Sequence, residues 1–207
     1  MIRPILRGRD ICRYSYHWAN LWLICTHNGV KDKGITKIPR IDINDYPAVK
    51  KHLDKYWDRI QRRDDQGDTP YNLRNCAYWG NFLTSKIVYQ ELTQGSCFYY
   101  DEKAEYFILQ TAYFISGNTN LDYLTKLLNS KFIEYCFRKF YSTSMGKSGF
   151  RWLSQYVEKL PIALYDNTAI QQKIVLCSHQ TDDENIDNLI YQMYGLTQEE
   201  ISTIEQS

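Results

Sequence analysis

The middle of the chain holds four short stretches of strand-forming residues, at 86–92, 97–100, 106–109 and 112–115. They are rich in Ile, Val, Tyr and Phe, and turn residues such as Gln94 and Gly95 punctuate them. Strands joined by such short turns pair in antiparallel fashion. This run of strands constrains the fold most, because it predicts an antiparallel meander at the centre of the chain.

Helical periodicity flanks the meander on both sides. Apolar residues recur at helical spacing over 45–60, where Asp45 is a plausible N-cap, and again over 121–140. The carboxyl end predicts one helix that Gly195 ends and another that begins with a capping box at 197–200. The order of elements indicates an α+β protein with a small, mostly antiparallel or mixed sheet, flanking helices and a helical C-terminal tail.

Charge is distributed unevenly along the chain. The net charge is only +1, but no Lys or Arg follows Lys173, and seven of the 24 acidic residues lie in 174–207. The rest of the chain, with 25 basic and 17 acidic residues, therefore carries +8, which suits a polyanionic partner. Two ordinary solvated faces are the alternative. We expect a main domain at 1–165 and an acidic helical extension at 166–207.

Composition bears on the compartment and on metals. No apolar run approaches the roughly 20 residues of a membrane span, and the amino terminus lacks the apolar core of a signal peptide, so we expect a cytoplasmic protein and no membrane partner. Six scattered cysteines without a Cys-x-x-Cys pair predict reduced thiols. A zinc site is the alternative, and its best candidate ligands are Cys12, His17, Cys25 and His27.

No catalytic motif is complete. The Gly-Lys-Ser at 146–148 lacks the glycine of a phosphate-binding loop, because Tyr141 stands at that position. Asp101 and Lys103 supply half of a metal-dependent nuclease site, but no Pro-Asp pair supplies the other half, and a solvated turn is the plainer interpretation. The Asn-Pro-Pro-Tyr loop and the Gly-rich cofactor turn of a base-amino methyltransferase are missing. We predict no catalytic residue, no metal ligand and no cofactor in this chain.

Two polar loops carry residues suited to DNA. The 71–75 loop combines a tyrosine ring, two Asn amides and a guanidinium, and Arg and Asn side chains match the edges of guanine and adenine. The 141–151 loop offers hydroxyls, glycines and two cations, which suit phosphate contacts. An ordinary polar loop is the alternative in each case. The predicted DNA-binding residues are Arg62, Arg63, Tyr71, Asn72, Arg74, Asn75, Trp79, Lys86, Lys147 and Arg151.

Several motifs occur in an order that resembles a known family. They lie at 5–11 (ILRGRDI), 46–53 (YPAVKKHL), 71–74 (YNLR), 86–91 (KIVYQE), 127–131 (LLNSK) and 156–162 (YVEKLPI). With the helical end at 190–197, they make the chain similar to the TaqI-like C-terminal specificity domain of adenine-specific DNA methyltransferases. That family includes fused restriction-modification enzymes. The resemblance extends over nearly the whole chain.

The resemblance implies a target-recognition domain, here 1–165, that clamps double-stranded DNA against a methyltransferase domain or subunit. That partner would hold S-adenosylmethionine and flip the target adenine out of the stack. It also implies that 6–10 and 89–91 hold the fold and the domain junction rather than contact bases. The chain would then recognise DNA without being an enzyme by itself. The rival hypotheses are a small nuclease and a module that docks a methyltransferase without touching DNA.

Overall fold

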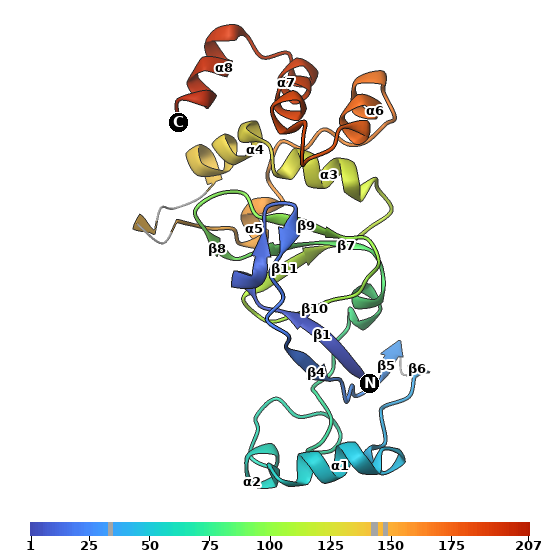
Figure 1. The fold of residues 1–207 in the computed structure, drawn as a ribbon. Helices are drawn as coiled ribbons and strands as arrows, with labels where there is room; N and C mark the ends of the chain where they lie inside the picture. The colour runs from blue at the N-terminus through green and yellow to red at the C-terminus, as the bar shows by residue number, and fades with distance from the viewer. Residues whose placement is uncertain (33–34, 142–144, 147–148) are drawn as a thin grey trace.

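The structure, a computed structural model, describes residues 1–32, 35–141, 145–146 and 149–207. Figure 1 shows the chain in three levels, with β-sheets in the middle, short helices at one end and a larger group of helices at the other. The amino terminus lies near the sheets and the carboxyl terminus among the larger group of helices. A long stretch of chain, from 39 to 79, therefore leaves the sheets, forms the lower end and returns.

The central sheet has the strand order β11-β7-β9 and is antiparallel throughout. Its strands are β7 (Lys86–Gln90), β9 (Phe98–Asp101) and β11 (Ala112–Ile115). Tyr89 and Phe98 lie opposite each other on one face, with ring centroids 5.0 Å apart. These three strands are the predicted ones and they pair in antiparallel fashion, but β7 lies between β9 and β11, so the predicted meander order is wrong. The mostly antiparallel pairing with flanking helices confirms the predicted α+β class.

The fourth predicted strand, 106–109, has a partner that the meander did not predict. Its strand, β10 (Phe107–Ile108), pairs in parallel with β1 (Ile2–Leu6), and β1 also pairs in antiparallel fashion with β4 (Trp22–Ile24). The meander prediction is wrong for this segment, because a strand from the amino terminus supplies its hydrogen bonds. The other strands are β2 (Ile11–Cys12), β3 (Ser15–Tyr16), β5 (Val30–Asp32), β6 (Ile35–Ile38), β8 (Leu92–Thr93) and β12 (Phe150–Arg151).

Both predicted long helices are divided. The segment 45–60 forms α1 (Pro47–Asp54) and α2 (Trp57–Ile60), and Tyr46 rather than Asp45 occupies the N-cap position of α1. Short 3-10 turns lie at Gly8–Asp10, Ile43–Asp45 and Trp79–Leu83.

The segment 121–140 forms α3 (Leu121–Leu128) and α4 (Lys131–Cys136), followed by a π-helical turn at Phe137–Tyr141. The division falls at Ser130, which has an extended backbone and whose hydroxyl accepts from Ile133 N–H at 3.2 Å, as an N-cap does.

The predicted tail is helical and shares the main core. After α5 (Ser154–Val157) come α6 (Ala169–Leu176), α7 (Asp183–Tyr194) and α8 (Gln198–Glu205). Gly195 ends α7 with φ +65°, and Thr197 and Glu200 form the predicted capping box. Ile174, Ile186 and Ile190 are buried in the same apolar cluster as the central sheet. The boundary at 165 stays a prediction, while the packing makes the tail part of the folded core.

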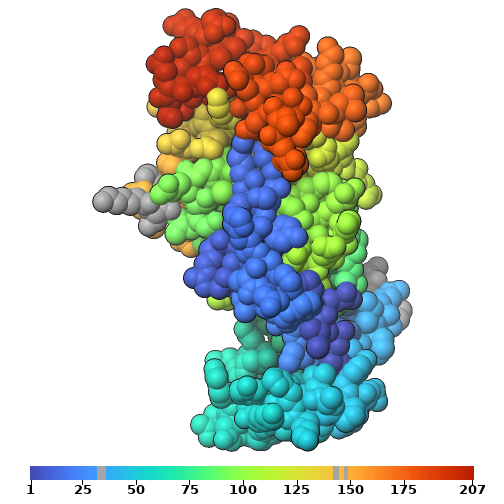
Figure 2. Space-filling model, in the orientation of Figure 1, coloured from blue at the N-terminus to red at the C-terminus, as the bar shows by residue number. Residues whose placement is uncertain are grey.

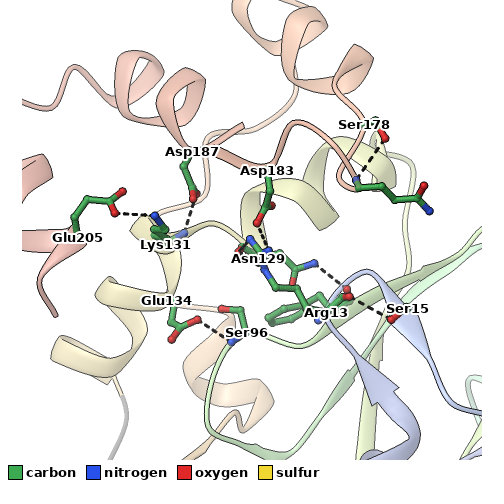
Figure 3. Close-up of polar contacts among 12 residues, drawn as sticks. Arg13, Ser15, Ser96, Asn129, Lys131, Glu134, Ser178, Asp183, Asp187 and Glu205 are labelled. Carbon is green, nitrogen blue, oxygen red and sulfur yellow. Dashed lines mark hydrogen bonds and ion pairs between the residues drawn. The ribbon is translucent and has the colours of Figure 1, made fainter. Parts of the chain in front are cut away.

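Polar contacts also hold the tail, as Figure 3 shows. Arg13, from the β2–β3 hairpin, forms an ion pair with Asp183 of α7 and donates to the Asn129 carbonyl at 2.9 Å. Lys131 at the start of α4 forms an ion pair with Glu205 of α8, with Nζ 2.7 Å from Oε2. These contacts join the amino-terminal hairpin, the α3–α4 junction and the two last helices into one unit.

Asp187 gives this unit a pH dependence. Its Oδ1 accepts from Lys131 N–H at 3.0 Å, while its buried Oδ2 has no hydrogen-bond partner among the described residues. Burial, only partly offset by that hydrogen bond and by Arg13, raises the pKa of Asp187 to about 6, and the nearby Asp183 carboxylate adds to the rise. The folded state thus favours protonated Asp187. The contribution of Asp187 to the free energy of unfolding is therefore complete below its unfolded pKa of about 4, and it is lost as pH rises through its folded pKa of about 6.

Replacing Asp187 with asparagine is expected to stabilise the protein at pH 7.5, because the amide keeps the Oδ1 acceptor and carries no buried charge. The gain in free energy of unfolding should be about 2 kcal/mol larger at pH 7.5 than at pH 4.5. Urea unfolding of parent and variant at both pH values measures the difference. A difference that does not change with pH would contradict the burial of a titrating carboxylate.

The described residues show no metal site. All six cysteines are free thiols, and no group of three His, Cys, Asp or Glu residues that could hold a metal occurs in the described ranges. The candidate zinc ligands Cys12, His17, Cys25 and His27 do not form such a group there. In the same part of the chain no helix is long and apolar enough to cross a membrane.

Candidate nucleic-acid interface

The helices α1 and α2 and the loop that follows them form a distinct lobe, residues 47–75. Figure 2 shows its helices standing out below the sheets, with a notch in the surface between them. Tyr71 ties the loop to the helices, because its hydroxyl donates to Asp54 Oδ1 at 2.6 Å and its ring lies 5.2 Å from that of Trp57. Lys50 lies over the same ring at 5.4 Å and pairs with Asp54 at 3.0 Å. Tyr71, a predicted contact, thus helps to assemble the lobe.

The loop is fixed to the sheet side of the molecule through residues 26–28. The Thr26 hydroxyl donates to Tyr71 O at 2.6 Å, and Leu73 N–H donates to Thr26 O at 2.8 Å. The buried Asn28 amide donates to Asp68 Oδ1 at 3.0 Å and to Asn75 Oδ1 at 2.7 Å. These bonds connect the 71–75 loop to residues 26–28 at both of its ends.

Asn72 and Arg63 stabilise this loop from within. Asn72 is 1% exposed; its amide donates to Ile41 O at 2.9 Å and accepts from Thr69 Oγ1 at 2.6 Å. Its prediction as a base contact is therefore corrected, because its hydrogen-bonding groups are buried and used by the chain. Arg63 is half-buried and donates to the carbonyls of Asn72 and Pro70 at 2.7 and 3.3 Å, so this cation is also occupied within the loop.

Lys86 and Trp79 are likewise placed inside the protein. Lys86 is fully buried, with Nζ 2.8 Å from Asp101 Oδ2, and the assignment of Lys86 to a phosphate contact is corrected for that reason. Trp79 is half-buried against His27 and Phe107, with ring centroids 4.8 and 5.4 Å away, so most of its ring packs in the protein.

Three predicted residues remain accessible on the lobe. Arg62 is exposed and makes no ion pair in the described part of the chain. Arg74 pairs with Asp65 at 3.1 Å, but the two side chains are 71% and 69% exposed, so solvent screens the pair strongly. Asn75 is exposed, and only its oxygen is used, by Asn28.

Sequence reasoning left three cations off the list of sites. Lys51, Lys55 and Arg59 are exposed, and like Arg62 they make no ion pair within the described ranges. Lys51 lies in α1 and Lys55 is its C-cap residue, while Arg59 lies in α2 and Arg62 follows that helix by two residues. These four exposed cations recur every three or four residues along the segment, and we call them the basic row. That spacing was visible in the sequence.

Aromatic rings are exposed beside the basic row. Tyr56 is 46% and Trp57 37% exposed, although large aromatic side chains are usually more deeply buried. Cations interleaved with accessible rings are typical of surfaces that bind nucleic acids.

The second predicted loop lies elsewhere. Lys147 falls outside the described residues. Arg151 is exposed on β12, which pairs with β8 at the level of the sheets, and its guanidinium forms an ion pair with Glu91. The structure therefore groups Arg62, Arg74 and Asn75 on the lobe and places Arg151 apart from them.

The nuclease hypothesis depended on Asp101. Both of its oxygens are used inside the fold: Oδ2 accepts from Lys86 Nζ and from Tyr106 N–H at 3.0 Å, and Oδ1 accepts from Glu105 N–H at 2.9 Å. The side chain is 1% exposed. A carboxylate buried and saturated in this way stabilises the turn after β9 and is not placed to bind a metal ion and substrate.

Two comparisons with known proteins bear on this arrangement. The family model described as the TaqI-like C-terminal specificity domain matches residues 3–162. The chain is also similar to the type II methyltransferase M.BstVI of Geobacillus stearothermophilus, with 22% identity over 212 residues. That match covers 100% of this chain and 36% of the relative, so the chain spans about a third of the relative's length.

Proposed function

Because the chain belongs to the family of TaqI-like C-terminal specificity domains, we propose that it recognises a specific sequence in double-stranded DNA for a type II restriction-modification methyltransferase. The observation that carries this proposal is the family match, which extends over 3–162 and includes the whole lobe. The exposed cations and rings of the lobe support it independently, since phosphate binding needs cations that are free to exchange their partners.

The lobe offers two kinds of contact. The basic row (Lys51, Lys55, Arg59 and Arg62) would neutralise phosphates and set the position of the duplex, a role that carries no sequence information. Arg74 and Asn75 would contact base edges, because Arg74 can leave its screened pair with Asp65 and the Asn75 Nδ2 group makes no hydrogen bond in the described chain. The hydrogen bonds of Asn72 and Arg63 would hold these side chains ready, which lowers the entropic cost of binding.

Catalysis, in this proposal, belongs to a methyltransferase domain or subunit outside this chain. Methyl transfer to adenine uses S-adenosylmethionine, and the sequence motifs that bind it are not found here. The chain would therefore act on specificity alone. The small nuclease is disfavoured because Asp101 is buried and saturated.

Reversing two charges of the basic row tests the proposal. Arg59→Glu with Arg62→Glu is expected to weaken binding of the chain to a short duplex by at least about tenfold at low salt. It should also lower the slope of log K against log salt by about 2, one for each lost phosphate contact. Fluorescence anisotropy over a salt series measures both, and selection from a random duplex library with the parent chain tests sequence preference.

The matched control is Lys159→Glu with Lys173→Glu, the same change in charge at two exposed lysines outside the lobe. It should leave affinity and slope close to those of the parent. Equal losses in both variants would mean that only net charge matters. No duplex binding by the parent at any salt would favour the module that docks a methyltransferase without touching DNA.

A further inference from the structure

The β11 edge of the central sheet has no strand beside it among the described residues. Glu91 N–H donates to Thr111 O at 3.2 Å, which places residue 111 at a hydrogen-bonded position opposite β7. Antiparallel pairs alternate between bonded and non-bonded positions, so residues 113 and 115 also point their backbone groups toward β7. Phe114 must then point its N–H and C=O away from the sheet. No bond to another described segment engages either group.

The opposite edge, at β9, is covered at Phe98. The outward N–H of Phe98 donates to Asn129 Oδ1 at 3.0 Å, and the outward carbonyl accepts from Asn129 Nδ2 at 2.8 Å. The same carbonyl accepts from Tyr14 N–H at 3.0 Å. The Phe98 position of one edge is thus covered, whereas no bond within the described residues covers the Phe114 position of the other, although unpaired edges are a liability that proteins normally cover.

An apolar groove of about 990 Å³ runs along the β11 edge. One wall lies on the face of the sheet that carries Phe114, with Tyr78 and Phe82, and the other lies on the opposite face, with Leu124, Val157 and Leu160. Because the side chains of a strand alternate between the two faces of a sheet, a strand added beside β11 would place successive side chains against the two walls in turn. The groove therefore has a shape that one additional β-strand would fill.

The chemistry of the groove disfavours DNA as its occupant. Glu158 is the one charged residue among the described residues that line it, and a negative rim repels phosphates. We therefore expect an apolar occupant, and the methyltransferase relative indicates where such a segment could come from. The relative of this chain is a methyltransferase of which the chain covers 36%, so most of that protein lies outside the part that is matched.

We propose that an extended segment of the methyltransferase part, with apolar residues at alternate positions, adds to the central sheet as a strand beside β11. This inference rests on the proposed function for the identity of the partner. The added strand accepts from Phe114 N–H and donates to Phe114 C=O, while its side chains fill both walls of the groove. The docking surface lies on the sheet and the basic row on the 47–75 lobe, so one chain can hold its partner and DNA on different surfaces.

Amide hydrogen exchange of Phe114 tests this directly. In the chain alone, Phe114 N–H should exchange at least about tenfold faster than Tyr113 N–H, which bonds to β7. In the complete methyltransferase that contains this domain, Phe114 N–H should become protected while Tyr113 N–H changes little. Equal exchange of Phe114 in the isolated chain and the complete enzyme would overturn the proposal, as would protection in the isolated chain that rises with its concentration, the sign of a second copy in the groove.

Two variants of the complete enzyme provide the matched comparison. Leu109→Glu with Leu164→Glu charges the exposed rim of the groove, at side chains that are 41% and 79% exposed, and should abolish the protection of Phe114. Leu176→Glu makes the same change at a leucine that is 84% exposed and does not line the groove, and should leave the protection intact. Protection that survives the rim variant would overturn the proposal. Duplex binding is measured separately, so a chain that docks but binds no DNA would reject the proposed function and retain this inference.

Discussion

Replacing Lys86 with methionine is expected to lower the free energy of unfolding by about 3–5 kcal/mol, because it leaves the Asp101 carboxylate buried without its counter-ion. Lys86 and Asp101 lie directly opposite each other on β7 and β9. Lys86 Nζ is 2.8 Å from Asp101 Oδ2, and both side chains are almost fully buried. Methionine matches the length of the lysine stem and leaves no large cavity, so the loss of stability can be attributed to the unpaired charge of Asp101. Chemical denaturation at neutral pH measures it.

Two controls separate the ion pair from other effects. Adding Asp101→Asn to Lys86→Met removes the unpaired charge and should restore part of the stability, although one backbone donor loses its acceptor. Lys103→Met, the same substitution at an exposed lysine in the turn beside Asp101, should change stability by less than about 0.5 kcal/mol. If Lys86→Met costs no more than Lys103→Met, the pair does not stabilise the fold.

Local patterns predicted most elements of this fold and missed their long-range partners. The strands at 86–92, 97–100 and 112–115 follow from local composition, but only the pairing of β7 with β9 agrees with a meander, because β11 pairs with β7 and not with its predecessor in the chain. The segment 106–109 was assigned to the same meander, but its hydrogen bonds go to β1, and periodicity within a segment carries no information about a partner so far away.

The division of the 121–140 helix has a local cause that periodicity does not detect. Apolar residues keep helical spacing across Asn129 and Ser130, yet the Ser130 hydroxyl caps a new helix and the Asn129 side chain is used by β9. Ser130 is a typical N-cap residue and can be recognised in the sequence, but the continuous apolar pattern favoured a single helix over 121–140.

The predicted site failed where a charge or an amide had an internal partner. Lys86 was selected for its charge, and Asn72 for its match to adenine. Their partners, Asp101 and the Ile41 carbonyl, become visible only when strand register and loop conformation are known. Lys51, Lys55 and Arg59 could also be predicted, since their four-residue spacing places them on one side of the single helix that the sequence indicates over 45–60.

Asn129 covers the β9 edge of the central sheet at Phe98. It is 1% exposed, and its amide pairs with both outward backbone groups of Phe98. Its own carbonyl accepts from Arg13, which also pairs with Asp183 of the tail. One side chain and one carbonyl therefore link β9, the α3–α4 junction and α7.

Replacing Asn129 with leucine should lower the free energy of unfolding by roughly 2–6 kcal/mol, because the buried Phe98 N–H loses its acceptor, the Phe98 carbonyl keeps only Tyr14 N–H, and each unmade bond costs about 1–3 kcal/mol. Asn129→Asp, nearly identical in shape, keeps the acceptor and turns a carboxylate oxygen toward the Phe98 carbonyl.

The aspartate variant should therefore be unstable at pH 8 and recover as pH falls, because protonation restores a donor and the folded state raises the pKa of the new carboxyl. Recovery of Asn129→Asp but not of Asn129→Leu on acidification would show that hydrogen bonding, rather than packing, covers this edge. Equal stability of the two variants at every pH would instead assign the role of Asn129 to its volume.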